Sequence, residues 1–168
     1  MITAGVTRKR SNVAMNDQPV EASMLIGRAP GEVFAAFVNP QTLRKFWLAD
    51  ASGPLAPGAR VPWQFMVPGA TAKVRVTRFE APRHLAFDWD DTMHVDMSFE
   101  AFGEAGTRAS VRVSGFEGAD ALAEATGTVE GFAIVLCDLK TLLETGESAN
   151  LVRDKAALIV AAQAARGG

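Results

Sequence analysis

Apolar and polar residues alternate along several segments of the chain, which is the pattern of strands that bury one face. The first segment runs from Pro19 to Arg28, and its predicted inward residues are Val20, Ala22, Met24 and Ile26. Five more alternating segments follow, separated by turns rich in Gly, Pro and Asp: 59–66, 73–79, 85–89, 94–100 and 108–113. Together these segments predict an antiparallel meander with one apolar face. Because Pro62 lacks a backbone N–H, its segment is expected at a sheet edge or with a bulge.

Two short helices are predicted between the first strand and the meander. Pro30 suits the first turn of a helix, where its missing N–H costs nothing. Asn39 ends this helix and caps the next one, in which Pro40 takes the first position. The apolar faces of the two helices are predicted to consist of Val33, Phe34, Phe37, Val38, Leu43, Phe46 and Trp47.

The hydrophobic period changes to three or four residues near the C-terminus, which predicts a long amphipathic helix that ends at Gly146. Its inward stripe is predicted to be Leu122, Ala125, Val129, Phe132, Leu136, Leu139 and Leu143. A weaker helix is predicted over 150–165, with its packed side made by Leu151, Leu158, Ile159 and Ala162. This order of elements predicts an α+β helix-grip fold, in which a curved antiparallel sheet wraps around the long C-terminal helix.

The length of 168 residues suits one domain. We expect a flexible tail over residues 1–16, one helix-grip domain over 17–146 and a C-terminal helical extension over 147–168. The tail carries a short basic run, Arg8-Lys9-Arg10, without the apolar stretch of a secretory signal. Met15 is an alternative to Met1 as the first translated residue.

Composition limits the classes of partner. Hydrophobic residues make up 48% of the chain, which is enough for a full core, and 17 Lys and Arg residues face 19 Asp and Glu residues. This balance argues against a nucleic-acid partner and against an anionic membrane surface. No apolar run is long enough to predict a transmembrane helix. The single cysteine, Cys137, excludes an internal disulfide, which favours a reducing cytoplasm.

Four segments carry a family resemblance: APGEVFAAFVNPQTLRKFW (29–47), EAPRHLAFDW (80–89), SFEAFGEAGTRASVRVSGF (98–116) and EGFAIVLCDLKTLLETG (130–146). Through them the chain resembles the SRPBCC or START-like superfamily and, within it, the bacterial branch named for homology to the activator of heat-shock protein 90 ATPase. Members of that branch often carry Gly-Trp where this chain has Gly131-Phe132, so an indole donor is lost here. The resemblance implies a cavity between the long helix and the concave face of the sheet.

The inward face of the predicted sheet is rich in aromatic side chains and Met, which suit an apolar ligand pocket. The residues expected to contact a ligand are Trp47, Trp63, Phe65, Val74, Phe87, Trp89, Met97, Phe99, Phe132 and Leu136. The same side chains would also fill a dry core, so both interpretations stay open at this point. Gly127 and Gly131 lie within the long helix, where each costs about 1 kcal/mol relative to Ala. Close approach to the sheet or to a ligand would explain these glycines, and so would fraying of the first turns.

Few residues predict catalysis or metal binding. Alternation places Asp88, His94 and Asp96 on the solvated face, opposite the apolar side chains, so we expect no metal site and no cofactor. Cys137 has no obvious His partner and is expected to be an inert buried thiol. Glu130 is the one carboxylate to consider at the pocket mouth, although an exposed acid in the first turn of the helix explains it as well. No catalytic residue is predicted.

The function expected from these patterns is binding of a small hydrophobic or amphipathic molecule without catalysis. One alternative is an enzyme, a cyclase, dehydratase or hydrolase of the kind that some START-like proteins resemble. Such an enzyme needs an ionisable residue with a perturbed pKa inside the cavity. Another alternative is an interaction module that binds a chaperone or another protein through an exposed apolar patch. A homodimer is also left open.

Overall fold

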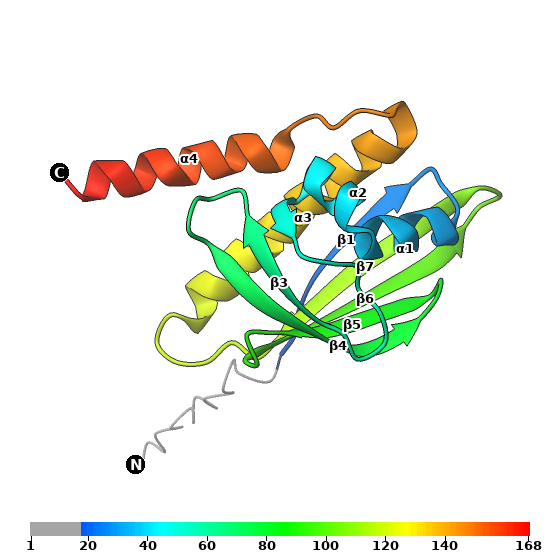
Figure 1. Ribbon diagram of the computed structural model, residues 1–168, viewed down its shortest axis with the longest axis horizontal. Coiled ribbons are helices and arrows are strands. Elements are labelled where there is room, and N and C mark those ends of the chain that lie inside the picture. Colours follow the sequence, from blue (N-terminus) through cyan, green and yellow to red (C-terminus); the bar gives the residue numbers. More distant parts are fainter. Residues whose placement is uncertain (1–17) are drawn as a thin grey trace, which may run out of the picture.

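The computed structural model describes residues 18–168, which form a seven-stranded antiparallel sheet and four helices (Figure 1). The strands are β1 (Val20–Ile26), β2 (Leu48–Ala51), β3 (Arg60–Phe65), β4 (Thr71–Glu80), β5 (His84–Trp89), β6 (Met93–Phe102) and β7 (Gly106–Ser114). The helices are α1 (Pro30–Val38), α2 (Pro40–Phe46), α3 (Ala121–Thr145) and α4 (Leu151–Arg166). The expected tail over residues 1–16 lies outside the described part of the chain. The predicted α+β helix-grip fold is confirmed.

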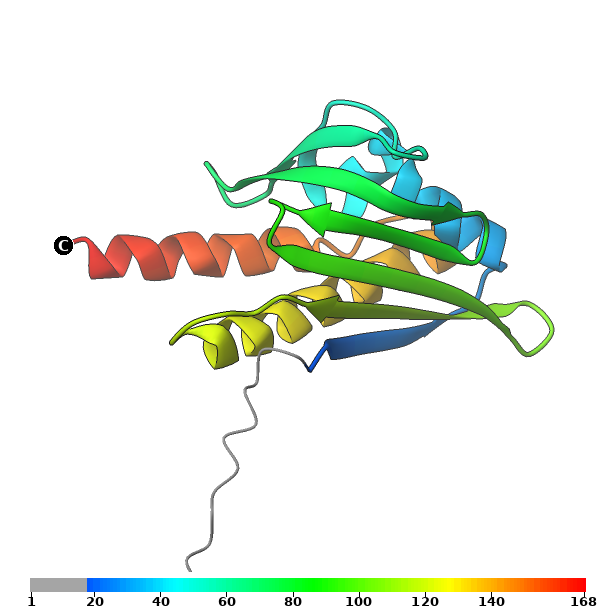
Figure 2. The ribbon, with the colours of Figure 1, turned by 90° about the horizontal axis from the view of Figure 1, so that it is seen from below.

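The sheet bends around α3, and its strand order is β1-β7-β6-β5-β4-β3-β2. The first strand therefore pairs with the last one. In the β1–β7 ladder, Val20 lies opposite Val113 and Ile26 lies opposite Thr107. Helices α1 and α2 lie on the same side of the sheet as α3 (Figures 1 and 2). All three helices thus cover one face and leave the other to solvent, as strict alternation requires.

The inward residues predicted from alternation form the core. The strands contribute buried apolar side chains at every second position, and α3 adds Phe132, Leu136 and Leu139. Phe37 connects the layers, because its ring lies 5.7 Å from those of Phe46 and Phe99 between centroids. Burying each such large apolar side chain contributes about 1.5–3 kcal/mol to folding.

The local signals at the helix ends act as predicted. The side chain of Asn39 accepts a hydrogen bond from the backbone N–H of Gln41 at 2.9 Å and so caps α2. Pro40 takes the first turn of that helix. Gly146 ends α3 in the left-handed conformation, with φ of 88°, which a residue with a Cβ atom adopts only at a cost.

One strand was not predicted, and it changes the place of Pro62. The four-residue strand β2 pairs with β3 as far as Ala51 and Trp63, so β3 is not an edge strand. The irregularity in this ladder lies at Leu48–Asp50 of β2, on the partner strand and not in the Pro62 segment where a bulge was predicted. Because β2 is so short, Pro62 lies at the end of the ladder, where its carbonyl oxygen accepts from Ser52 N–H at 3.4 Å.

Two predicted helix faces are wrong in detail. Leu122 is 61% exposed, because Ala121 and Ala125 occupy the inward side of the first turn of α3. Leu151 and Leu158 of α4 are also exposed. The packed side of that helix consists of Val152, Ala156 and Ile159. Ile159 was predicted on this side, whereas the predicted Ala162 is exposed. One position rotates a helix face by about 100°, so placing the stripe at Leu151 and Leu158 instead of Val152 and Ile159 leaves those two leucines in solvent.

Candidate functional site

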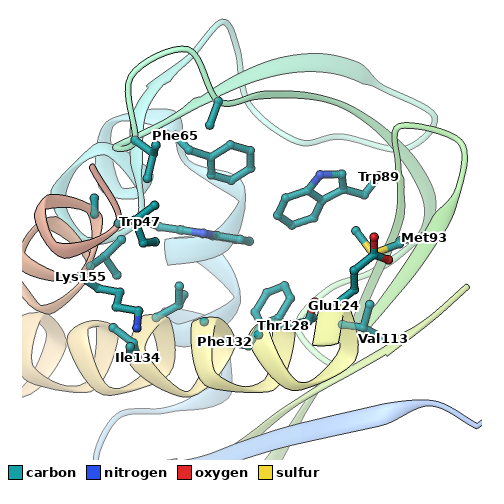
Figure 3. Close-up of a pocket in the computed structure, with 18 of the residues that line it drawn as sticks. Trp47, Phe65, Trp89, Met93, Val113, Glu124, Thr128, Phe132, Ile134 and Lys155 are labelled. Carbon is teal, nitrogen blue, oxygen red and sulfur yellow. The ribbon is translucent and has the colours of Figure 1, made fainter. Parts of the chain in front are cut away.

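A cavity of about 930 Å³ opens between α3, α4 and one end of the sheet (Figure 3). The sheet contributes the β3–β4 turn, the β5–β6 turn and the residues that follow β7. Trp47, at the C-terminal end of α2, closes the inner side. Helix α4 supplies Val152, Lys155, Ala156 and Ile159 to the wall, so the C-terminal helix is part of the cavity.

Four aromatic rings form the inner wall. Phe65 and Trp89 stack in parallel, with 5.0 Å between centroids and 6° between planes. Phe132 reaches up from α3 and meets Trp47 edge-on at 5.6 Å and Trp89 at 6.3 Å. Phe132 and Trp89 therefore meet across the helix–sheet interface. We call these four residues, Trp47, Phe65, Trp89 and Phe132, the aromatic wall.

The other six residues expected at the ligand site lie in the core and do not line this cavity. They are Trp63, Val74, Phe87, Met97, Phe99 and Leu136. The reason is a second aromatic layer: the ring of Trp63 packs 5.0 Å behind that of Trp47 and 5.4 Å from Phe87. Alternation predicts which side chains of a strand point inward, but it does not predict how far each one lies from the cavity. Only residues near the strand ends reach the opening.

The two glycines of α3 lie at the floor of the cavity. A Cβ atom at Gly127 or Gly131 would meet nothing within 4 Å, and both residues line the cavity. Helix α3 is continuous through them, so neither fraying nor a close protein contact explains these positions. The missing side chains leave open space beside Phe132.

Charged side chains at the cavity come from residues that the sequence patterns did not single out. Asp91, Glu117 and Glu124 line one end, and Lys155 lines the wall on α4. Glu130 is not part of the lining; its Oε1 atom lies 2.6 Å from Nζ of Lys155. Helical spacing could have identified Glu124. It precedes Thr128 by four residues and Gly131 by seven, so the three residues lie on the same face of α3.

Asp88 corrects the prediction of a solvated polar face. This residue is only 3% exposed, although it lies on the outer side of the sheet. Its two cross-strand neighbours are Arg75 on β4 and His94 on β6, and both side chains contact the Asp88 carboxylate. Long neighbours on adjacent strands can bury a polar residue that alternation alone places in water. Within residues 18–168 no group of three or more His, Cys, Asp or Glu side chains is arranged to hold a metal ion.

The sheet wrapped around α3 and the open cavity beside that helix define a protein of the helix-grip class. The sequence profile of the Activator of Hsp90 ATPase homolog 1-like proteins matches residues 28–144. The chain belongs to this family. No curated protein matches the chain by sequence.

Solved bacterial structures share the fold. A protein of Staphylococcus saprophyticus, SSP2350, is 26% identical with a TM-score of 0.69, over 78% of this chain and 95% of that one. The Aha1 dimer from Colwellia psychrerythraea is 20% identical with a TM-score of 0.68, over 78% and 99% of the two chains. MLL2253 from Mesorhizobium loti is 20% identical with a TM-score of 0.66, over 76% and 97%. None of the helices described in residues 18–168 has the length and apolar character to cross a membrane.

Proposed function

We propose that this protein binds a small hydrophobic or amphipathic molecule in the cavity beside α3, without converting it. The observation that carries the proposal is the open space of about 930 Å³ against the aromatic wall. Small-molecule sites in proteins have volumes of about 300–1,000 Å³ and predominantly apolar linings.

The two glycines of α3 support this proposal. Each glycine in a helix interior costs about 1 kcal/mol relative to Ala, and here neither has a protein neighbour that an Ala side chain would displace. Folding alone would therefore favour Ala at Gly127 and Gly131. A ligand that occupies the space beside them gives a reason for their presence.

Binding without catalysis is the simpler proposal because the aromatic wall carries no acid–base pair. Cys137 is the one cysteine of the chain; it is half-buried, where a buried thiol was expected, and it does not line the cavity. The enzyme alternative would rest on the carboxylates at the cavity end. Saturable conversion of a compound, abolished by a substitution at Glu124, would establish that alternative.

The experiment that tests the proposal combines a retained-ligand search with a binding assay. Native mass spectrometry of gently purified protein is expected to show an added mass. An environment-sensitive hydrophobic dye is expected to bind at one site with a dissociation constant near 1 μM, which is about −8 kcal/mol. Gly131→Leu fills the cavity and should abolish dye binding, whereas Ala123→Leu places the same side chain on the exposed side of α3 and should not. Equal dye binding by both variants would contradict the proposal.

We also propose that the protein forms a homodimer, on the basis of exposed apolar residues on α4. Helix α4 exposes three large apolar residues, Leu151, Leu158 and Val160, and its C-terminal end extends beyond the sheet (Figures 1 and 2). A related structure from Colwellia psychrerythraea is described as a dimer. Sedimentation of the protein and of Leu158→Glu tests the pairing, since a charge at this position should dissociate a dimer that uses α4.

We propose that the helix-grip domain ends near residue 146, that 147–168 is an extension of it, and that the protein works in the cytoplasm. The net charge of −2 supports a partner other than nucleic acid. Binding assays with short DNA duplexes and with anionic vesicles test this expectation. Binding that is lost at moderate salt would be nonspecific electrostatic attraction.

A further inference from the structure

The charges on the cavity wall are unevenly distributed. Asp91, Glu117 and Glu124 are acidic, and among residues 18–168 Lys155 is the one basic residue in the lining. The three acids come from three segments: the β5–β6 turn, the loop after β7 and the first turn of α3. These segments meet at one end of the sheet. In particular, a Cβ atom on Gly115 would lie 2.3 Å from the carbonyl oxygen of Thr92.

Lys155 does not neutralise this acidic end. Its ammonium group is 2.6 Å from Oε1 of Glu130, and Figure 3 shows it at the opposite end of the cavity from Glu124. Asp91 has a distant partner, since its Oδ1 lies 3.7 Å from Nε of Arg75. Within the described chain, Glu117 and Glu124 have no ion-pair or hydrogen-bond partner for their carboxylates.

The positive end of α3 offsets part of this negative charge. A helix N-terminus carries the equivalent of about half a positive charge, whereas Glu117 and Glu124 carry two negative ones. Counted over residues 18–168, the balance at this end of the cavity stays negative. Figure 3 shows the Glu124 carboxylate beside Met93 and Val113, next to the space in front of Trp89 and Phe132.

We infer that the molecule bound in this cavity is an amphipathic cation, with an apolar body against the aromatic wall and an amine or ammonium group at Glu117 and Glu124. This inference rests on the proposed binding function and adds the chemical class of the ligand. Aromatic faces attract cations within about 6 Å of the ring centroid, so the wall and the carboxylates favour the same charge. An anionic amphiphile such as a fatty acid would meet repulsion at this end and a neutralised lysine at the other.

The test uses three probes with the same ring: naphthylethylamine, naphthylethanol and naphthylacetate, titrated calorimetrically at pH 7 into the full-length protein. The amine should bind about tenfold more tightly than the carboxylate at low salt. The ratio is not expected to be larger, because ion pairs with exposed carboxylates are individually weak. The alcohol should lie between them. The ratio should fall to about twofold at 1 M salt, where the screening length is about 3 Å.

Two variants connect this preference to the carboxylates. Glu124→Gln and Glu117→Gln keep the side-chain shape and should each lower the amine affinity about threefold while leaving the alcohol unchanged. Glu104→Gln, in the exposed β6–β7 turn, is the matched control and should change nothing. If Glu124→Gln disturbs the start of α3, Glu117→Gln in the preceding loop still carries the test.

The outcomes separate this inference from the proposed function. Binding of the alcohol without an advantage for the amine, or tighter binding of naphthylacetate, overturns the cationic ligand and leaves cavity binding intact. A preference for the amine that both Gln variants retain also overturns the assignment to these carboxylates. If none of the three probes binds, the cavity does not take such molecules, and the proposed function fails together with the inference.

Discussion

The carboxylate of Asp138, about two turns before the end of α3, accepts a hydrogen bond from the hydroxyl group of Ser148 at 2.7 Å. The same Oδ1 atom accepts from the backbone N–H of Ala149 at 3.1 Å, and Oδ2 accepts from Val152 N–H at 3.4 Å. Asp138 is 1% exposed. One buried acid therefore holds the segment between α3 and α4 and the first turn of α4, the helix that forms one side of the cavity.

The first prediction concerns this attachment. Asp138→Ala leaves three donors without their acceptor and should lower the free energy of unfolding by about 2–3 kcal/mol. Ser148→Ala removes one of the three bonds and should cost about 1 kcal/mol. Urea unfolding measures both, and hydrogen exchange should show faster exchange in 149–160 for Asp138→Ala. Unchanged exchange in that segment would mean that packing alone holds α4.

The second prediction compares two apolar residues on one helix. Phe132 lines the cavity, whereas Leu136, one turn later, is 0% exposed in the core. Leu136→Ala should cost about 3–5 kcal/mol, and Phe132→Ala should cost less than the 3–5 kcal/mol typical of a fully packed Phe, about 2 kcal/mol. Denaturant unfolding tests this order. At a temperature where both variants are folded, dye affinity should fall only for Phe132→Ala, and an equal fall in both would contradict the placement of the site.

The third prediction exploits the glycines. Gly127→Ala should raise the free energy of unfolding by about 0.5–1 kcal/mol, because the helix gains propensity and the new methyl group meets no atom within 4 Å. The same change narrows the cavity and should weaken ligand binding. Thermal unfolding and dye titration of one preparation measure both effects. A loss of stability would show that this position needs glycine for the backbone itself.

The fourth prediction concerns the stability of the protein at low pH. Oε1 of Glu144 accepts from Nζ of Lys140 at 2.8 Å and from the backbone N–H of Gly27 at 2.7 Å. The bond from Lys140 is the main cause that lowers the pKa of Glu144, opposed by partial desolvation and supported by the Gly27 N–H. A carboxyl group whose pKa is lower in the folded state stabilises the protein above its unfolded pKa, about 4.3, and loses that contribution as the pH falls through the folded value.

Glu144→Gln should therefore be less stable than the unchanged protein at pH 7, and the difference should shrink as the pH falls below about 4. Thermal midpoints across this range give the test, with Glu104→Gln as the exposed control. A constant difference at all pH values would mean that the shape of the side chain, rather than its charge, closes the gap between β1 and α3. The fit is tight there, since a Cβ on Gly27 would lie 2.6 Å from Glu144 Oε1.

The fold followed from local patterns because the direction of a side chain is a local property. Alternation places Val95, Met97 and Phe99 on one face of β6 whatever the neighbouring strands are, and these residues are buried. Capping at Asn39 and termination at Gly146 depend on one or two residues each, so they too were predictable. Strand β2 was missed because four residues give too short a pattern to distinguish a strand from a loop.

The candidate site was predictable only in its chemistry. The sequence by itself determined that aromatic residues line the inner face, and it named Trp47, Phe65, Trp89 and Phe132 together with six others, without distinguishing the two groups. Tertiary structure decided that these four reach the cavity while Trp63 and Phe87 stay behind them, because sheet curvature and ring packing set depth. It also brought Glu117 and Glu124 to the cavity end and Lys155 across from them, since contacts between distant segments depend on how the whole sheet closes around α3.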